Sequence, residues 1–192
     1  MNALALALEW AAMLGTSERD PSEVDRLASE LIELSTRHGF VHWRARGAIY
    51  RGWARSASGD TAEGIPWIEQ GIRDFRTMGL VLRLPGHLAR KAEALHLADR
   101  TSEALEVINE AGALAERFEN RYWCAELHRL RAVFLAAIGA DETKIEASLC
   151  EAIRTAKEQK SVSLAKRAEA TYAEYRRQKA SVSGGHGFRL PL

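Results

Sequence analysis

The 192-residue sequence predicts an all-α protein, and three observations support this fold class. Only four prolines are present, and alanine, leucine, glutamate and arginine, which are strong helix formers, dominate the composition. No stretch alternates apolar and polar residues with the period of two that is typical of a strand. Turn residues recur about every 40 residues, so we expect a repeated structural unit.

Two interleaved series of turn signals define this repeat. The first series is Gly59-Asp60, Asp99-Arg100 and Gly139-Ala140-Asp141, and the second is Gly39, Gly79, Glu119-Asn120 and Lys160-Ser161. The stretches between the turns have helical periodicity and are long enough for several helical turns. The predicted helices are 2–15, 21–38, 41–57, 61–77, 82–98, 101–118, 121–138, 143–159 and 162–178.

The first two helices begin differently. Residues 1–15 form a short apolar run that is interrupted by Glu9 and lacks a basic start, so a secretory signal is not expected. The second helix begins at Asp20-Pro21, where proline occupies a first-turn position that needs no backbone N–H. No apolar stretch approaches the length of a membrane span.

Apolar stripes define the later helices, and a near-capping box at Asp60–Glu63 begins the fourth. The stripes of the third, fifth, sixth and seventh helices are Trp43, Gly47, Tyr50, Ala54 and Ala57; Leu84, Leu88, Ala92 and Leu95; Ala104, Ile108, Ala111, Ala115 and Phe118; and Trp123, Leu127, Leu130, Phe134 and Ala137. Helices of this kind, joined by short turns, form antiparallel hairpins, and a constant period stacks the hairpins into a solenoid.

Small residues where helices must approach closely favour tetratricopeptide-like repeats over other solenoids. These residues are Gly52, Gly64 and Gly71, then Ala92, Ala104 and Ala111, then Ala132 and Ala152, with Ile108 and Leu149 as the large residues beside them. The period of 40 exceeds the usual ~34, so each helix must be longer than standard. HEAT-like repeats fit the length better but lack this signature. We therefore predict a right-handed solenoid of about four and a half hairpins in one domain, residues 1–180, followed by a flexible tail, 181–192.

Charge and cysteine content narrow the class of partner. The net charge of +1 argues against a nucleic-acid surface over the whole molecule, although residues 161–192 carry six Lys or Arg and only two Asp or Glu. The basic end of the last helix complements its dipole, and no aromatic platform lies nearby, so nucleic-acid binding is not expected. Cys124 and Cys150 form no disulfide framework. These features predict a cytoplasmic protein.

The motifs that carry catalysis or hold metals are weak or absent in the sequence. His38 and His42 have ligand spacing but straddle Gly39, and the Cys124 and His128 pair is more simply structural. There is no GxSxG and no phosphate loop, and the "SGGHG" of residues 183–187 is followed by residues that cannot begin a helix. We expect no cofactor, no metal and no enzymatic activity, although an enzyme with a pocket between helices is the competing class.

Three segments resemble a known group of bacterial signalling proteins. They are "HGFVHWRARGAIYRGWARSASGDTAEGIPWIEQGIRDFR" (38–76), "YWCAELHRLRAVFLAAIGAD" (122–141) and "KSVSLAKRAEATYAEYRRQKASVSGGHGFRLPL" (160–192). They are similar to the C-terminal tetratricopeptide array of proteins that carry a class III adenylate/guanylate cyclase or winged-helix domain and a STAND-type ATPase module upstream. The resemblance implies a regulatory or interaction segment, because this chain has no counterpart of those catalytic parts.

A concave groove lined by the first helix of each hairpin is the expected binding surface. The residues one turn from each small packing position are Arg46, Ile49, Trp53, Glu93, His96, Glu126 and Arg129. Their mixed charge suits a protein or peptide partner, while Trp53 fits the core and the groove equally well. The apolar tip Phe188, Leu190 and Leu192 either folds back or docks on a neighbouring molecule. Alternative functions are the repeat region of a winged-helix regulator and a self-association module that forms homo-oligomers.

Overall fold

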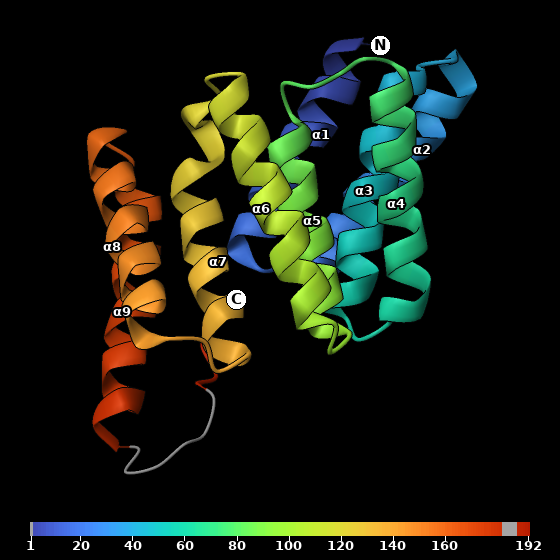
Figure 1. Ribbon diagram of the computed structural model, residues 1–192. Coiled ribbons are helices and arrows are strands. Elements are labelled where there is room, and N and C mark those ends of the chain that lie inside the picture. The colour runs from blue at the N-terminus through green and yellow to red at the C-terminus, as the bar shows by residue number, and fades with distance from the viewer. Residues whose placement is uncertain (1, 182–187) are drawn as a thin grey trace. The chain divides into compact units, whose positions relative to one another are not determined.

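The computed structural model describes residues 2–181 and 188–192, and within them it confirms the all-α prediction (Figure 1). Within α1–α5 and within α6–α9, helices that follow one another in the chain pack as antiparallel hairpins, which is consistent with tetratricopeptide-like repeats. The helices are α1 (Asn2–Glu18), α2 (Pro21–His38), α3 (Val41–Ala57), α4 (Thr61–Thr77), α5 (Leu84–Leu97), α6 (Thr101–Arg117), the 3-10 turn η1 (Arg121–Trp123), α7 (Cys124–Ala137), α8 (Glu142–Glu158) and α9 (Val162–Ser181).

Six of the predicted helices begin or end away from their predicted positions, among them α9, which continues past residue 178 to Ser181. Helix α5 begins at Leu84 rather than residue 82, because Pro85 occupies one of its first two positions and Arg83 serves as the N-cap residue. The predicted helix 121–138 is divided into η1 and α7. Helix α1 continues past Gly15 to Glu18, so the end of the apolar run did not mark the end of the helix. Local composition therefore placed the helices but not all of their first and last turns.

Eight turns of the same type end the eight helices α1 to α8. In each turn one residue has positive φ: Arg19, Gly39, Gly59, Gly79, Asp99, Glu119, Gly139 and Lys160. The next N–H donates to a carbonyl five residues earlier, as from Phe40 to Ser35 at 2.8 Å and from Asp60 to Arg55 at 2.9 Å. This is the hydrogen-bond pattern of a Schellman motif. Both predicted turn series are thus confirmed, and together they place a turn about every 20 residues along the chain.

The chain forms two compact units, Met1–Arg100 and Thr101–Leu192. In the first unit each helix packs on the next, and α3 also contacts both α1 and α5. In the second unit α6, α7, α8 and α9 pack in the same sequential way, and α7 also contacts α9. Odd-numbered helices therefore touch one another directly within each unit.

The predicted small residues lie at helix–helix contacts. Ala92, Ala104, Ala111, Ala132 and Ala152 are all fully buried. At Gly71 of α4, an added methyl group would lie 2.6 Å from the carbonyl oxygen of Ala45 in α3, so only glycine fits. The small residues in the signature are thus packing positions, as the sequence indicates. No helix in the described residues is long and apolar enough to cross a membrane.

Candidate functional site

Each unit buries charged side chains where its odd-numbered helices face one another. The most buried of them are Glu9 of α1, Arg90 and Glu93 of α5, and Glu126 and Arg129 of α7, each less than a tenth exposed. A buried charge costs several kcal/mol unless a partner compensates it, so every such residue needs a specific neighbour. The contacts that supply these neighbours define two networks, one in each unit.

Glu9 is the centre of a network in the first unit. Its side chain is fully buried, and its Oε1 accepts hydrogen bonds from the Tyr50 hydroxyl at 3.2 Å and from an Arg83 guanidinium nitrogen at 2.9 Å. An Arg46 nitrogen lies 3.7 Å from the other carboxylate oxygen. Burial raises the pKa of Tyr50 to about 12, so its hydroxyl stays a donor. One carboxylate thereby ties α1 to both α3 and the start of α5.

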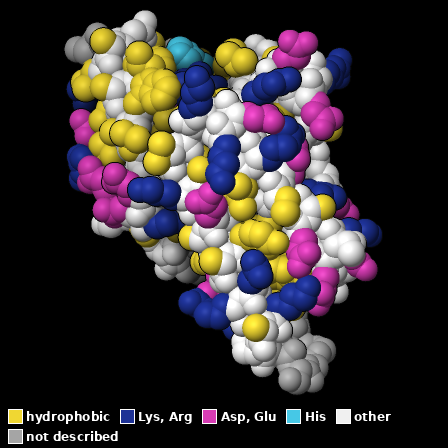
Figure 2. Space-filling view, turned by 90° about the vertical axis from the view of Figure 1, so that its left-hand side faces the viewer, with side chains coloured by type: hydrophobic (Ala, Val, Ile, Leu, Met, Phe, Trp, Pro, Cys, Tyr) yellow, Lys and Arg dark blue, Asp and Glu magenta, His cyan; other side chains and the backbone are white. Residues whose placement is uncertain are grey.

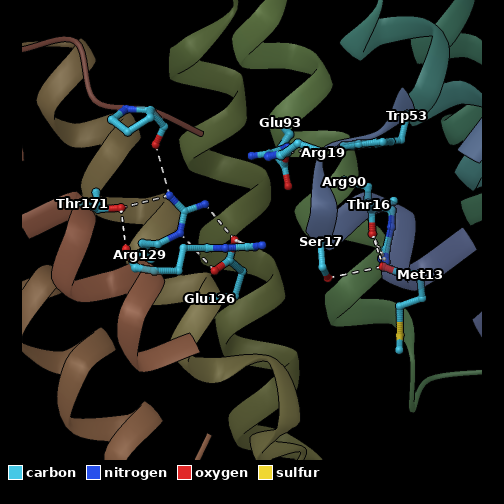
Figure 3. A network of polar contacts seen from close by, with 12 residues as sticks. Met13, Thr16, Ser17, Arg19, Trp53, Arg90, Glu93, Glu126, Arg129 and Thr171 are labelled. Carbon is cyan, nitrogen blue, oxygen red and sulfur yellow. Dashed lines mark hydrogen bonds and ion pairs between the residues drawn. The ribbon is translucent and has the colours of Figure 1, made fainter. Parts of the chain in front are cut away.

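A second group of contacts joins the far ends of α1 and α5. Glu93 accepts hydrogen bonds from Arg19 and, at 3.3 Å, from the indole nitrogen of Trp53 (Figure 3). Arg90 donates to Thr16 at 3.4 Å and stacks over the Tyr50 ring at 4.5 Å. The pairs 9–83, 16–90 and 19–93 all share one separation of 74 residues. This constant separation means that α1 and α5 run parallel and in register.

His87 is a buried ionisable side chain of α5 that lies beside this network. It is 2% exposed, and neither ring nitrogen has a hydrogen-bond partner in the described residues. Its ring meets Phe75 edge-on at 4.8 Å and Tyr50 at 6.3 Å. Burial, followed by the positive charges of Arg90, Arg46 and Arg83, holds the pKa of His87 well below its usual range. The imidazole is therefore neutral at physiological pH.

Arg129 is the centre of the network in the second unit. It is 1% exposed and binds both carboxylate oxygens of Glu126, at 3.0 Å through Nε and at 2.8 Å through a terminal nitrogen (Figure 3). Its other terminal nitrogen donates to the Thr171 hydroxyl of α9 at 3.4 Å. Arg167 of α9 also donates to Glu126 at 3.2 Å. This bidentate pair and its neighbours join the inner faces of α7 and α9.

The last five residues of the chain lie against this second network. Arg129 donates to the carbonyl oxygen of Pro191 at 3.1 Å. The Gln178 side chain of α9 donates to the Arg189 carbonyl at 2.7 Å and accepts from the Arg189 N–H at 3.0 Å. Leu190 is 7% exposed. The protein thus holds an extended segment through three of its main-chain groups.

An aromatic contact fixes the start of this segment, because Phe188 meets Tyr175 of α9 edge-on at 4.9 Å. The sequence left open whether the apolar tip folds back or docks elsewhere, and Phe188 and Leu190 fold back. This packing differs from the flexible tail predicted for 181–192: Ser181 belongs to α9 and residues 188–192 lie on α7 and α9. Residues 182–187, including the "SGGHG" stretch, lie outside the described residues.

The seven predicted groove residues separate into different environments. Ile49 is fully buried, and an added methyl group on Gly71 of α4 would meet its Cγ1, so it lies in the core rather than in a groove. Trp53 was expected in either the core or the groove, and at 1% exposed it lies in the core. Its indole nitrogen donates a hydrogen bond to Glu93. His96 is half-buried and has a pKa lowered by burial.

The four charged residues of the predicted set lie in the two buried networks. Arg46 and Glu93 belong to the first network, and Glu126 and Arg129 form the second. Sequence reasoning missed Glu9, whose interruption of an apolar run was the available signal. It also missed Gln178, and no local pattern marks that residue.

A cavity of about 360 Å³ between α6 and α7 contains the predicted Cys124 and His128 pair. The Cys124 thiol donates to the Asn120 carbonyl at 3.6 Å, and burial raises its pKa. Burial lowers the pKa of His128. In the parts of the chain that the structure describes, no group of three His, Cys, Asp or Glu residues is arranged to hold a metal ion.

The surface has no field of a single sign on the face shown in Figure 2, where positive and negative side chains are interspersed. Elsewhere in the described chain, exposed charges also pair along single helices, as Arg26 does with Glu23 and Glu30, and Arg154 with Glu151 and Glu158.

Fold and contacts together define a helical-repeat protein whose inner faces carry buried charge networks. No protein-family model matches the sequence. The chain is 29% identical over 170 residues to a protein of Rhizobium meliloti (strain 1021), "Uncharacterized protein R02095". The match covers 88% of this chain and 16% of that protein, so the chain spans about a sixth of the relative's length. The chain is thus similar to a segment of a much larger protein.

Proposed function

We propose that the chain is a non-catalytic protein-interaction module that recognises an extended peptide on the inner face of α7 and α9. The segment 188–192 carries this proposal, because it occupies that face as a peptide ligand would. Main-chain groups of Arg189 and Pro191 are bound by Gln178 and Arg129, while Phe188 and Leu190 supply apolar anchors. Recognition of main-chain groups together with alternate side chains is a recurring mode of peptide binding.

The contacts on this face can hold a peptide while placing few requirements on its amino-acid sequence. Gln178 pairs with the N–H and the C=O of one residue, a contact that any residue except proline could make. The Arg129 guanidinium is already oriented by Glu126 and Thr171, so little side-chain entropy is lost when it binds a carbonyl. The aromatic contact at Tyr175 then selects an aromatic residue three positions before the second bound carbonyl.

In this proposal, the segment 188–192 competes within the molecule against a partner peptide for the same face. A tethered ligand acts at an effective concentration on the order of 1 mM when its linker is short and flexible. A partner segment therefore needs higher intrinsic affinity, or a change that releases the tail. This gives the module a closed state and an open state without any catalytic chemistry.

We further propose that the module belongs to a longer bacterial signalling protein with an upstream nucleotide cyclase and ATPase module. The resemblance of residues 38–76, 122–141 and 160–192 to the C-terminal arrays of such proteins supports this, as does the similarity to a small part of a long relative. A winged-helix regulator is the alternative parent. The upstream coding sequence tests the choice, and the absence of all three modules there would refute both.

A fluorescein-labelled peptide Phe-Arg-Leu-Pro-Leu is the probe that tests the peptide site. In the 192-residue chain, the double substitution Phe188→Ala and Leu190→Ala weakens the internal competitor. We expect fluorescence anisotropy to show at least tenfold tighter probe binding by this variant than by the wild type. Adding Gln178→Ala to the double variant should remove most of that binding.

Arg154→Ala in the same double variant is the matched control, because Arg154 is an exposed arginine of α8 that forms ion pairs with Glu151 and Glu158 of its own helix. Its probe affinity should equal that of the double variant. Failure of the double variant to bind the probe, or equal binding with and without Gln178→Ala, would refute the proposed site.

A further inference from the structure

Helix α1 exposes an apolar face, on which the Arg83 guanidinium lies over the Trp10 ring at 4.9 Å from its centroid. Leu4, Leu6, Trp10 and Leu14 are 46%, 42%, 41% and 58% exposed. The opposite side of the helix is also apolar and is buried, where Ala5, Leu8 and Ala12 lie. Glu9 is the only charged residue before Glu18, and it points into the buried network. The exposed face therefore carries no charged side chain of α1 until Glu18, the last residue of the helix, which is unusual for a solvated surface.

The repeat allows this face of α1 to be compared with the equivalent face of α3, 40 residues later in the chain. Forty residues after Ala7 stands Gly47 of α3, and an added methyl group there would lie 2.7 Å from Ile32 and 3.2 Å from the Ala28 carbonyl of α2. Gly47 thus marks the strip of α3 that α2 covers. Trp43 and Ala54 lie four residues before and seven residues after it, on the same helical strip, and both are buried.

The equivalent strip of α1 is the exposed one. Ala3, Ala7 and Leu14 correspond to Trp43, Gly47 and Ala54 by the repeat period, and all three are exposed. Ala7 is small, as the contact position requires, so another helix could approach α1 closely. The difference between the two strips is that α3 has an even-numbered helix before it in the described structure and α1 has none.

We propose that the exposed face of α1 binds an amphipathic α-helix, placed on α1 as α2 is placed on α3. The contact between α2 and α3 specifies the partner's chemistry. It needs a small and a β-branched apolar residue four positions apart, as at Ala28 and Ile32. It needs no acidic residue in the place of Asp25, because Arg51, which Asp25 faces at 3.6 Å, corresponds to the uncharged Ala11.

A helix of a longer polypeptide fits this face better than a second copy of the chain. The face is one helix wide, and α1 is about 25 Å long at 1.5 Å per residue. A stable interface between two chains buries roughly 800 Å² on each partner, more than four half-exposed side chains offer. A covalently connected helix avoids most of the cost of association. The matched segment is only 16% of the Rhizobium protein, which leaves ample chain for such a helix.

A fusion protein tests this inference with a helix of known chemistry. A copy of residues 20–40 is joined directly before residue 1 of the full chain, which gives the spacing that separates α2 from α3. Amide hydrogen exchange, read by mass spectrometry, should show at least tenfold slower exchange over residues 4–14 than in the unfused chain. Exchange over α3 and α4 should be unchanged, which confirms that the rest of the first unit is folded.

The matched control carries Ala28→Glu and Ile32→Glu in the added copy only. This fusion should leave exchange in α1 as fast as in the unfused chain. The inference is overturned if the first fusion gives no slowing or if both fusions slow exchange equally. It is also overturned if the unfused chain sediments as a dimer that Leu14→Glu dissociates, since the occupant is then a second copy.

Discussion

Gly52 of α3 and Gly64 of α4 face each other so closely that neither position has room for a side chain. A methyl group added at Gly52 would lie 2.5 Å from the Gly64 carbonyl oxygen, and one added at Gly64 would strike the Gly52 carbonyl. The obstacles include these backbone atoms, which cannot move aside as a flexible side chain would. The hairpin of α3 and α4 depends on this contact, because the two helices meet through their backbones.

We expect Gly64→Ala to destabilise the protein by at least ~2 kcal/mol, although alanine is the better helix former by ~1 kcal/mol. Urea unfolding at neutral pH measures the change. Gly112→Ala is the control, because a methyl group at that helical position meets nothing within 4 Å. It should be neutral or stabilising, and equal effects of the two substitutions would contradict the close-contact explanation.

Lys160 holds the left-handed turn position between α8 and α9 with φ of 54°, where four of the eight turns have glycine. A non-glycine residue in this conformation costs about 1 kcal/mol, so Lys160→Gly should stabilise the protein by up to that amount. Greater freedom of glycine in the unfolded chain reduces the gain. Thermal unfolding checks the direction. Lys157→Gly, one turn earlier within α8, should instead lower the melting temperature.

His87 makes the first unit sensitive to acid. Its pKa is lowered in the folded state, so the unfolded chain binds a proton near pH 6.5 that the folded chain does not. Stability from this residue is complete above pH 6.5 and falls as the pH drops below it, by at most ~1.4 kcal/mol per pH unit. His87→Gln should remove this dependence. Urea titrations at pH 7, 6 and 5 compare the two proteins, and parallel losses of stability in both would contradict the assignment.

Arg129 stabilises the protein because it compensates the buried charge of the Glu126 carboxylate. Arg129→Ala removes the bidentate partner of the buried Glu126 carboxylate and should cost ~3–5 kcal/mol. The combined change Arg129→Met and Glu126→Leu should cost much less, because it removes both buried charges. Hydrogen exchange of α7 and α9 measures the difference. A double variant as unstable as Arg129→Ala would mean that shape rather than charge pairing determines stability there.

Much of this fold could be predicted because its determinants are local. Turn residues such as Gly59 and Gly79 act within six residues, and the small positions such as Ala104 follow from the repeat. The buried networks could not be predicted in the same way. The contact between Glu9 and Arg83 joins residues 74 apart, and its existence depends on how α1 and α5 run beside each other. No spacing within one helix encodes that relation.

The candidate site could be predicted in part, because its residues were chosen from the local repeat pattern. Arg46, Glu93, Glu126 and Arg129 were chosen because they flank small packing positions, and all four lie on facing odd-numbered helices. Their burial was not foreseen, because an arginine in a helix looks the same in sequence whether its partner is water or a carboxylate. Ile49 shows a different error. It was expected in the groove, but its position around α3 turns its side chain toward α4.

The identical turns along the chain have a consequence for how such a protein changes length. Each even-numbered helix ends in the same hydrogen-bonded junction, at Gly39, Gly79, Glu119 and Lys160. Removing or duplicating the 40 residues between two of these junctions would therefore rejoin the chain through a turn it already makes. Arrays built in this way can gain or lose a hairpin in one genetic step without inventing a new connection.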